Sequence, residues 1–262
     1  TWDDGQCCSY DLGCCSWSNL PDDDFAIQDD NPWTIGEFVW TGFDYLGEPT
    51  PYKEYWPSRS AYFGIFDLAG LPKDRYWLYR SRWNESSPTI HILPHWTWPG
   101  REGKVTPVYC YTSYPSAELF VNGKSQGRRT KDPSSRLDRY RLRWNDVVYQ
   151  PGELRVVAYD ANGKVSGERV VRTAGKPSAL AVSADRVALA APSSDDTPDL
   201  AFVTVDVVDE DGNLCPDADC RLRFDTEGSV AFRAVCSGDP TSIERFSKPS
   251  MKAFGGRRVG LV

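Results

Sequence analysis

Three carboxylates and one tryptophan that could bind or act on a polar ligand stand within the segment GEFVWTGFDYLGE (36–48). The side chains of Glu37, Asp44 and Glu48 can accept hydrogen bonds, and a carboxyl group that is kept protonated can also donate a proton. Trp40 offers a flat apolar face and one N–H donor. Because apolar residues precede Trp40 and turn-forming residues follow it, the segment is typical of a strand that ends at a ligand pocket.

The elements expected around this segment are those of an α/β fold. The sequence WTIGEFVW (33–40) is almost entirely apolar, which predicts a strand buried on both faces, as in a parallel sheet. A long loop over 41–60 and an extended piece over 61–67 lead to a predicted helix over 73–83. One face of that helix carries Tyr76, Tyr79, Arg80 and Trp83. A shorter helix is predicted over 21–30, with aspartates in its first turn, where the helix dipole favours negative charge.

The pattern changes near residue 88 to short alternating strands separated by turns. Asn122-Gly123 and Asn162-Gly163 are strong hairpin signals. We therefore expect a β-sandwich over 88–175 and a second sandwich over 176–262, with no helix after residue 90. Residues 1–87 form the remaining part of this three-domain division.

Composition and charge exclude some classes of protein. The net charge of the 262 residues is −7, and no lysine- or arginine-rich run stands out, so the sequence argues against a nucleic-acid partner. No run of eighteen apolar residues occurs, which argues against a membrane span. The aromatic content of 13% suits stacking on flat apolar faces, although core filling explains most of these rings equally well.

The cysteines and histidines do not predict a metal site. Four of the eight cysteines lie in CCSYDLGCC (7–15), whose two adjacent pairs do not match the spacing of zinc sites. Buried free thiols or one disulfide are the alternatives to a metal site. Cys215 and Cys220 are close enough in sequence for a hairpin disulfide. Pro94 lies between His91 and His95, so a helical histidine pair is not expected. Trp96 and Trp98 could form a platform for a sugar, but burial is the favoured alternative.

The chain resembles glycoside hydrolase family 2, in its β-galactosidase branch. The resemblance begins at GEFVWTGFDYLGEPTPY, continues through FGIFDLAGLPKDRYWLYRSRW and LPHWTWPGREGKVTPVYCYTSYPSAELFVNGKSQGRR, and ends at SGDPTSIERF and KAFGGR. It implies the C-terminal remnant of a (β/α)8 TIM barrel followed by two all-β immunoglobulin-like sandwiches, with no cofactor. Ser237 departs from the family, which usually has Asn there, and Cys8 stands where the family has a serine.

The resemblance also implies what the chain lacks. Retaining glycosidases use two carboxyl groups about 5–5.5 Å apart, and in this family both belong to glutamates that precede the quoted segment. No Glu occurs before Glu37, so the nucleophile and the acid/base are expected upstream of Thr1, in a longer chain. Glu37 lies three residues before the end of its predicted strand, whereas barrel active sites lie at that end, so we expect a structural acid.

The resemblance assigns substrate roles to two residues. Trp40 matches a tryptophan that lines the sugar subsite, with core filling as the alternative. Asp44 would accept hydrogen bonds from sugar hydroxyls or would stabilise a turn, and these two interpretations stay open. Glu48 is expected to order the loop.

The substrate class is predicted from a missing motif. The β-glucuronidases of the family carry Asn-x-Lys before Gly-Ile-Phe, whereas this chain has Ala61-Tyr62-Phe63 before Gly64. A β-galactoside is therefore the expected carbohydrate partner, and a periplasmic or secreted bacterial location is expected from the family. The sequence leaves the oligomeric state open.

Two alternatives to an enzyme fragment are a carbohydrate-binding module and a purely structural role for the sandwiches. The first predicts an exposed row of aromatic side chains, and Tyr109, Tyr111 and Tyr114 do not keep the strict alternation that one face requires.

Overall fold

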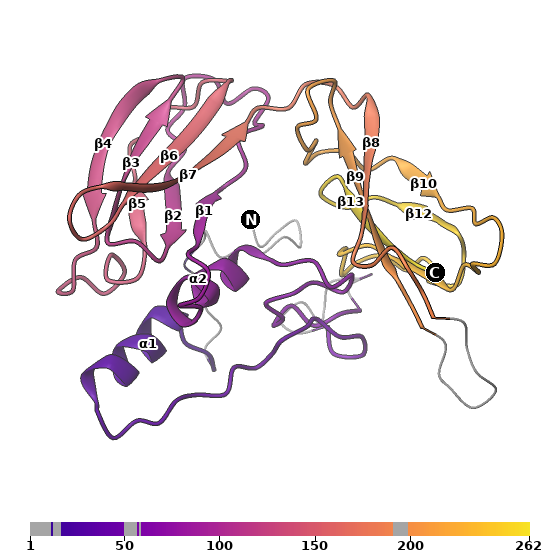
Figure 1. Cartoon of the computed structure of the whole chain (residues 1–262), viewed down its shortest axis with the longest axis horizontal. Helices are drawn as coiled ribbons and strands as arrows, with labels where there is room; N and C mark the ends of the chain where they lie inside the picture. The colour runs from indigo at the N-terminus through magenta and orange to yellow at the C-terminus, as the bar shows by residue number, and fades with distance from the viewer. Residues whose placement is uncertain (1–11, 13–16, 50–56, 58, 191–198) are drawn as a thin grey trace. The chain divides into compact units, whose positions relative to one another are not determined.

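The computed structural model describes residue 12 and residues 17–49, 57, 59–190 and 199–262 (Figure 1). These residues form two compact units. The first unit comprises the described residues up to Gly42 together with Phe63–Phe66 and Pro72–Thr173, and the second comprises Phe43–Tyr62, Asp67–Leu71 and Ala174–Val262. The chain therefore crosses between the two units several times before Ala174, and from Ala174 onward it belongs to the second unit.

The first unit is built on two antiparallel sheets that share one core. One sheet has the strand order β1-β2-β5 and the other β4-β3-β6-β7. Buried residues from the inner faces of both sheets, including Cys110, Leu119 and Val156, form a single apolar cluster, which defines a β-sandwich. The strands are β1 (Ile90–Leu93), β2 (Val108–Thr112), β3 (Ser116–Val121), β4 (Lys124–Thr130), β5 (Leu142–Trp144), β6 (Glu153–Tyr159) and β7 (Val165–Arg172).

Both predicted Asn-Gly hairpins are present. Asn122 and Gly123 connect β3 to β4, and both have positive φ, which is the conformation that a two-residue hairpin turn requires. Gly163, also at positive φ, lies in the turn between β6 and β7. The Asp160 side chain accepts hydrogen bonds from the Asn162 and Lys164 amides, 2.9 Å each, and closes that turn.

Both predicted helices are present and pack against the outer face of the β1-β2-β5 sheet. They are α1 (Pro21–Asp30) and α2 (Asp74–Trp83). Phe25 of α1 and Leu78 of α2 form a buried cluster with Tyr109 and Tyr111 of β2. Because one face of β2 meets the sandwich core and the other meets the helices, all five of its residues are buried. Within the described residues no helix follows α2, as expected.

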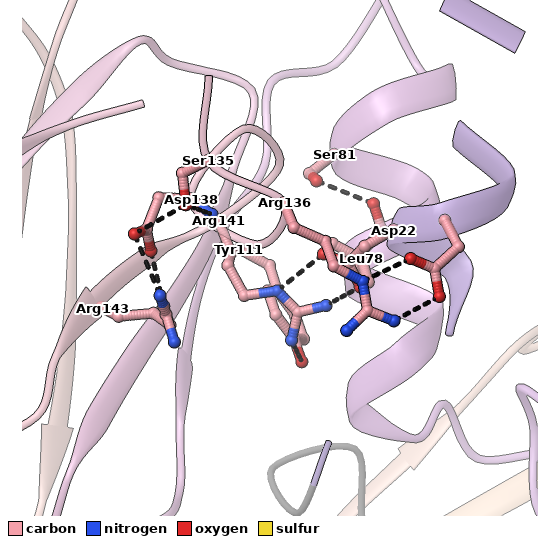
Figure 2. A network of polar contacts seen from close by, with 10 residues as sticks. Asp22, Leu78, Ser81, Tyr111, Ser135, Arg136, Asp138, Arg141 and Arg143 are labelled. Carbon is pink, nitrogen blue, oxygen red and sulfur yellow. Dashed lines mark hydrogen bonds and ion pairs between the residues drawn. The ribbon is translucent and has the colours of Figure 1, made fainter. Parts of the chain in front are cut away.

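Helix α1 is held on this sheet by charge as well as by Phe25. Asp22 and Arg141, which are 0% and 2% exposed, form a buried ion pair, and the Arg141 guanidinium also donates to the Tyr111 hydroxyl at 3.3 Å (Figure 2). Arg136 pairs with Asp23 at 2.5 Å on the solvent side. The aspartates predicted to face the helix dipole therefore also bind arginines that lie more than one hundred residues later in the chain.

The second unit has a smaller sandwich. A four-stranded sheet of order β11-β13-β9-β8 faces a two-stranded sheet, β10-β12. Val205 and Val207 of β9, Leu222 of β10 and Ala253 form the shared apolar cluster. The strands are β8 (Ala179–Ala184), β9 (Phe202–Val208), β10 (Arg221–Arg223), β11 (Ala234–Cys236), β12 (Ser250–Lys252) and β13 (Arg257–Leu261).

One expectation about local structure is wrong. Residues 33–40 form no regular strand, and Ile35 and Phe38 are fully exposed rather than buried. A parallel strand needs neighbours that supply its hydrogen bonds and cover its faces, and no described segment pairs with this one. Of the two alternatives left open for the cysteines, the described ones follow the free-thiol alternative, since Cys215 and Cys220 are not bonded to each other. Cysteines 7, 8, 14 and 15 lie outside the described residues.

Within the described residues the architecture is predominantly β-sheet with two short helices, which is consistent with β-sandwich domains. The domain borders near 87 and 175 stay predictions. Among the described residues, no helix combines the length and apolar character needed to cross a membrane.

Candidate functional site

Backbone hydrogen bonds build a small platform at the end of the segment that carries Trp40. The amide of Ile65 donates to the Thr41 carbonyl at 3.1 Å, and the amide of Phe66 donates to the Gly42 carbonyl at 2.9 Å. The amide of Lys73, immediately before α2, donates to the Ile65 carbonyl at 2.9 Å. Residues 41–42 are thus paired with 63–66, which in turn are tied to the start of α2.

Trp40 is exposed at the beginning of this platform. Its side chain is 73% exposed, and the peptide bond that joins it to Thr41 is cis. In the described structure the Trp40 side chain does not fill a core. An exposed indole face can contact the C–H face of a sugar ring.

Glu37 lies in a polar cluster between the helices. Burial is the main cause that raises the pKa of the Glu37 carboxyl, and the Asp24 carboxylate of α1 adds to the rise, while Gln28 and Arg82 oppose it. The Oε1 atom of Glu37 is buried without a hydrogen-bond partner, and the same is true of Gln28 Nε2. A carboxyl group enclosed in this way is suited to stay protonated more readily than an exposed one.

Asp44 belongs to the second unit and is 6% exposed. It precedes a two-stranded arm, which we define as residues 45–47 and 59–61. In this arm the Ala61 amide donates to the Tyr45 carbonyl at 2.8 Å and the Gly47 amide donates to the Arg59 carbonyl at 3.0 Å. The Tyr45 hydroxyl donates to the Glu48 carboxylate, consistent with the expected loop-ordering role of Glu48.

The histidines and the tryptophans near them have structural partners. His91 Nε2 lies 2.7 Å from Asp74 Oδ1, and its ring stacks on Trp77. His95 stacks on Trp98, with ring centroids 4.1 Å apart. Trp96 is completely buried in the sandwich core, as the favoured alternative expected. Among the described residues, no group of three or more potential metal ligands comes together.

The described structure has an open groove beside α2 and a hollow in the second unit, and neither is lined by Trp40 or Asp44. An open groove of about 530 Å³ runs along the face of α2 that the sequence predicted, lined by Ile65, Tyr76, Tyr79, Arg80, Trp83 and the residues that follow the helix. A second hollow of about 300 Å³ lies in the second unit beside Leu180, Val182 and Phe224. Aromatic rings and the Arg80 guanidinium line the groove on α2, and the groove is wide open to solvent.

The sandwiches do not show the surface of a carbohydrate-binding module. Such a module needs a row of exposed rings, and among the described residues after 88 Phe202 is the one exposed large aromatic side chain. Tyr109 and Tyr111 are buried under the helices.

Comparisons with known proteins agree with this geometry. Residues 180–262 match the family model "Glycoside hydrolase family 2 C-terminal domain 5", and residues 103–167 match a domain of unknown function, DUF4982. Over 96% of its length the chain is 46% identical to "Beta-galactosidase BoGH2A" of Bacteroides ovatus. The chain belongs to glycoside hydrolase family 2.

Other family 2 relatives differ in the activity that their names state. A "Putative beta-glucuronidase" of Formosa agariphila is 34% identical over 90% of the chain. The crystal structure of a β-glycosidase from Bacteroides vulgatus superposes with a TM-score of 0.82 and 33% identity, covering 96% of the chain and 31% of that protein. The chain spans 28% of the length of the Bacteroides ovatus relative and 22% of the Formosa agariphila relative.

Sequence reasoning missed Arg59, which joins the arm to the second sandwich. It lies in a stretch of mixed polar and aromatic residues with no regular period, so no local pattern distinguishes it. Its partners lie about 180 residues later in the chain, and only the folded structure brings them together.

Proposed function

We propose that the chain is the C-terminal part of a retaining exo-β-galactosidase that hydrolyses terminal β-galactosides. The observation that carries this proposal is the 46% identity, over nearly the whole chain, to a family 2 protein named as a β-galactosidase. Residues 1–87 would then be the last part of a (β/α)8 barrel. The exposed side chains of Ile35 and Phe38 support this, because the missing barrel strands would cover them.

Trp40 and Asp44 are the proposed substrate-binding residues. The 73% exposure of Trp40 leaves its indole face accessible to a sugar ring. Asp44, which is 6% exposed, would accept hydrogen bonds from sugar hydroxyls. The catalytic nucleophile and acid/base are proposed to lie in the part of the longer protein that precedes this chain.

The second candidate substrate is a β-glucuronide, since four relatives are named as β-glucuronidases or putative β-glucuronidases. The residues at 61–63 favour the galactoside. Ala61 is completely buried, and neither Tyr62 nor Phe63 carries a charge that could pair with a sugar carboxylate. The nearby cation Arg59 donates from Nη2 to the Glu244 carbonyl at 3.2 Å.

The test is to measure kcat/KM of the longer protein on matched aryl β-galactoside and aryl β-glucuronide substrates. We expect a preference for the galactoside of at least about a hundredfold, because a carboxylate in a site without a cation is poorly solvated. A preference for the glucuronide would refute the proposed substrate but would leave the family assignment intact.

A further inference from the structure

The arm that follows Asp44 is fastened to the second sandwich by Arg59. The Arg59 amide donates to the Pro240 carbonyl at 3.2 Å, and Arg59 Nη2 donates to the Glu244 carbonyl at 3.2 Å. The guanidinium carbon also lies 5.4 Å from the centre of the Phe246 ring. Backbone and side chain of one residue therefore both attach to residues 237–246, which we call the clamp segment.

A second, independent contact joins the clamp segment to the turn 67–71. A Cβ atom added at Gly238 would lie 2.0 Å from Asp67 Oδ2, so only glycine fits there without displacing the Asp67 side chain. Asp67 Oδ1 accepts hydrogen bonds from the amides of Ala69 and Leu71, at 2.8 and 2.9 Å, and thereby holds the turn. The Cys236 thiol donates to the Leu68 carbonyl at 3.4 Å.

The Arg59 contacts attach to the sandwich a segment that has little structure of its own. Within the described residues, the arm has two cross-strand backbone hydrogen bonds and the Leu46–Ser60 bridge, which is too little for an isolated hairpin to be stable in water. Contacts from a packed sandwich can supply the missing stabilisation. The position of Asp44, next to the arm, then depends on the clamp segment.

We propose that the clamp segment of the second sandwich positions the Asp44 arm for sugar binding, with Arg59 as the positioning residue and Gly238 as a required small residue. This inference rests on the proposed function, since it assigns the second sandwich a part in substrate affinity. Arg59 acts through the arm and touches no reacting atom. A binding residue on a loose loop loses affinity, because the loop must be ordered each time substrate binds.

The first test uses the chain itself and requires no activity. Hydrogen exchange is measured in peptides covering 43–49 and 59–66 for the unsubstituted chain, Arg59→Ala and Gly238→Ala, with Arg223→Ala as the matched control. Arg223 is an exposed arginine of β10 that pairs with Asp225 and does not contact the arm. We expect exchange in the arm to become at least about tenfold faster in the first two variants, with no change in the β9 and β13 peptides.

The second test measures steady-state kinetics of the same variants in the longer protein. We expect the KM for an aryl β-galactoside to rise about tenfold in Arg59→Ala and Gly238→Ala, with kcat changed less than about threefold. Arg59→Lys should recover only part of the loss, because an ammonium group lacks the planar fork of the guanidinium.

Hydrogen exchange in the arm that is unchanged in Arg59→Ala and Gly238→Ala would contradict the proposal that the clamp segment holds the arm. An equal rise in KM in the control Arg223→Ala would also contradict it. Faster exchange with an unchanged KM would refute the role in sugar affinity. If the unsubstituted longer protein hydrolysed no β-galactoside, the proposed function would fail, while the exchange result would still decide whether the clamp segment holds the arm.

Discussion

Trp40 and Glu37 stand three residues apart and have opposite environments. Trp40 is largely exposed, whereas Glu37 has a buried oxygen without a partner, and burial raises the pKa of its carboxyl group. A raised pKa is also a property of catalytic acids, so it cannot by itself assign a role. We propose a structural role for Glu37, because the groups that shift its pKa are side chains of the two helices, Asp24 and Gln28 of α1 and Arg82 of α2.

Replacement of Trp40 should therefore affect catalysis without unfolding the protein. In the longer protein we expect Trp40→Ala to lower kcat/KM for an aryl β-galactoside by about 10- to 100-fold, because one apolar wall of the sugar site is lost. Trp33→Ala is the matched control, since Trp33 is 77% exposed in the same segment. Equal losses in the two variants would show that the segment tolerates no substitution and would contradict a specific role for Trp40.

Asp209 is the residue whose ionisation should matter most for the second sandwich. Its carboxylate accepts hydrogen bonds from the amides of Gly175, Asp211 and Asn213 and from the Asn213 side chain, and these lower the pKa of Asp209 to about 2. A lowered pKa means that the stabilisation is fully present above the ordinary value of 3.8 and is lost as the pH falls toward 2.

We expect Asp209→Asn to lower the urea midpoint of the chain at pH 6, and the difference from the unsubstituted chain to shrink as the pH approaches 2. Urea unfolding at a series of pH values measures this directly. Asp225→Asn is the control, because Asp225 is exposed and its ion pair with Arg223 lies at the surface. A difference that stays constant with pH would contradict an electrostatic origin.

Among the elements, helix α1 is attached to the sandwich by a buried ion pair. The pattern of apolar residues along the helix does not predict this pair. The buried Asp22–Arg141 pair joins α1 to the strand region of the sandwich, and burial raises the pKa of Asp22 while Arg141 opposes the rise. Removing one partner leaves the other charge buried alone, whereas removing both leaves none. Asp23 of the same helix pairs with Arg136 at the surface, where solvent reaches both side chains.

We expect Asp22→Ala to lower the free energy of unfolding by about 3–5 kcal/mol, and the double variant Asp22→Leu with Arg141→Met to lose markedly less. Arg136→Ala should change it by under about 1 kcal/mol. Chemical denaturation of the four proteins tests this set. A double variant less stable than Asp22→Ala would show that the pair itself stabilises the fold.

The elements also show how far the sequence predicts this structure. Both helices, the two Asn-Gly hairpins and the buried Trp96 follow from local pattern, since turn chemistry and apolar period act over a few residues. The prediction of a strand over 33–40 is wrong because a parallel strand forms only beside neighbouring strands, and no described segment supplies them. Arg141 and Arg59 could not be predicted, since their partners are more than one hundred residues away.

For the whole molecule, we propose that this chain contributes binding and positioning and that a preceding part of a longer family 2 protein contributes the chemistry. The second unit contains the Asp44 arm as well as the second sandwich. The sandwich that matches the C-terminal family model is thus physically joined to the loop that we propose to contact the sugar.

The most direct test is turnover of a chromogenic β-galactoside by the purified chain 1–262, beside the longer protein, with and without Glu37→Gln. The account predicts no turnover above background by the chain, because two carboxyl groups must act together in a retaining glycosidase. It also predicts that Glu37→Gln in the longer protein keeps kcat within about threefold of the unsubstituted enzyme. Turnover by the chain alone that disappears in Glu37→Gln would contradict the account and make Glu37 a catalytic residue.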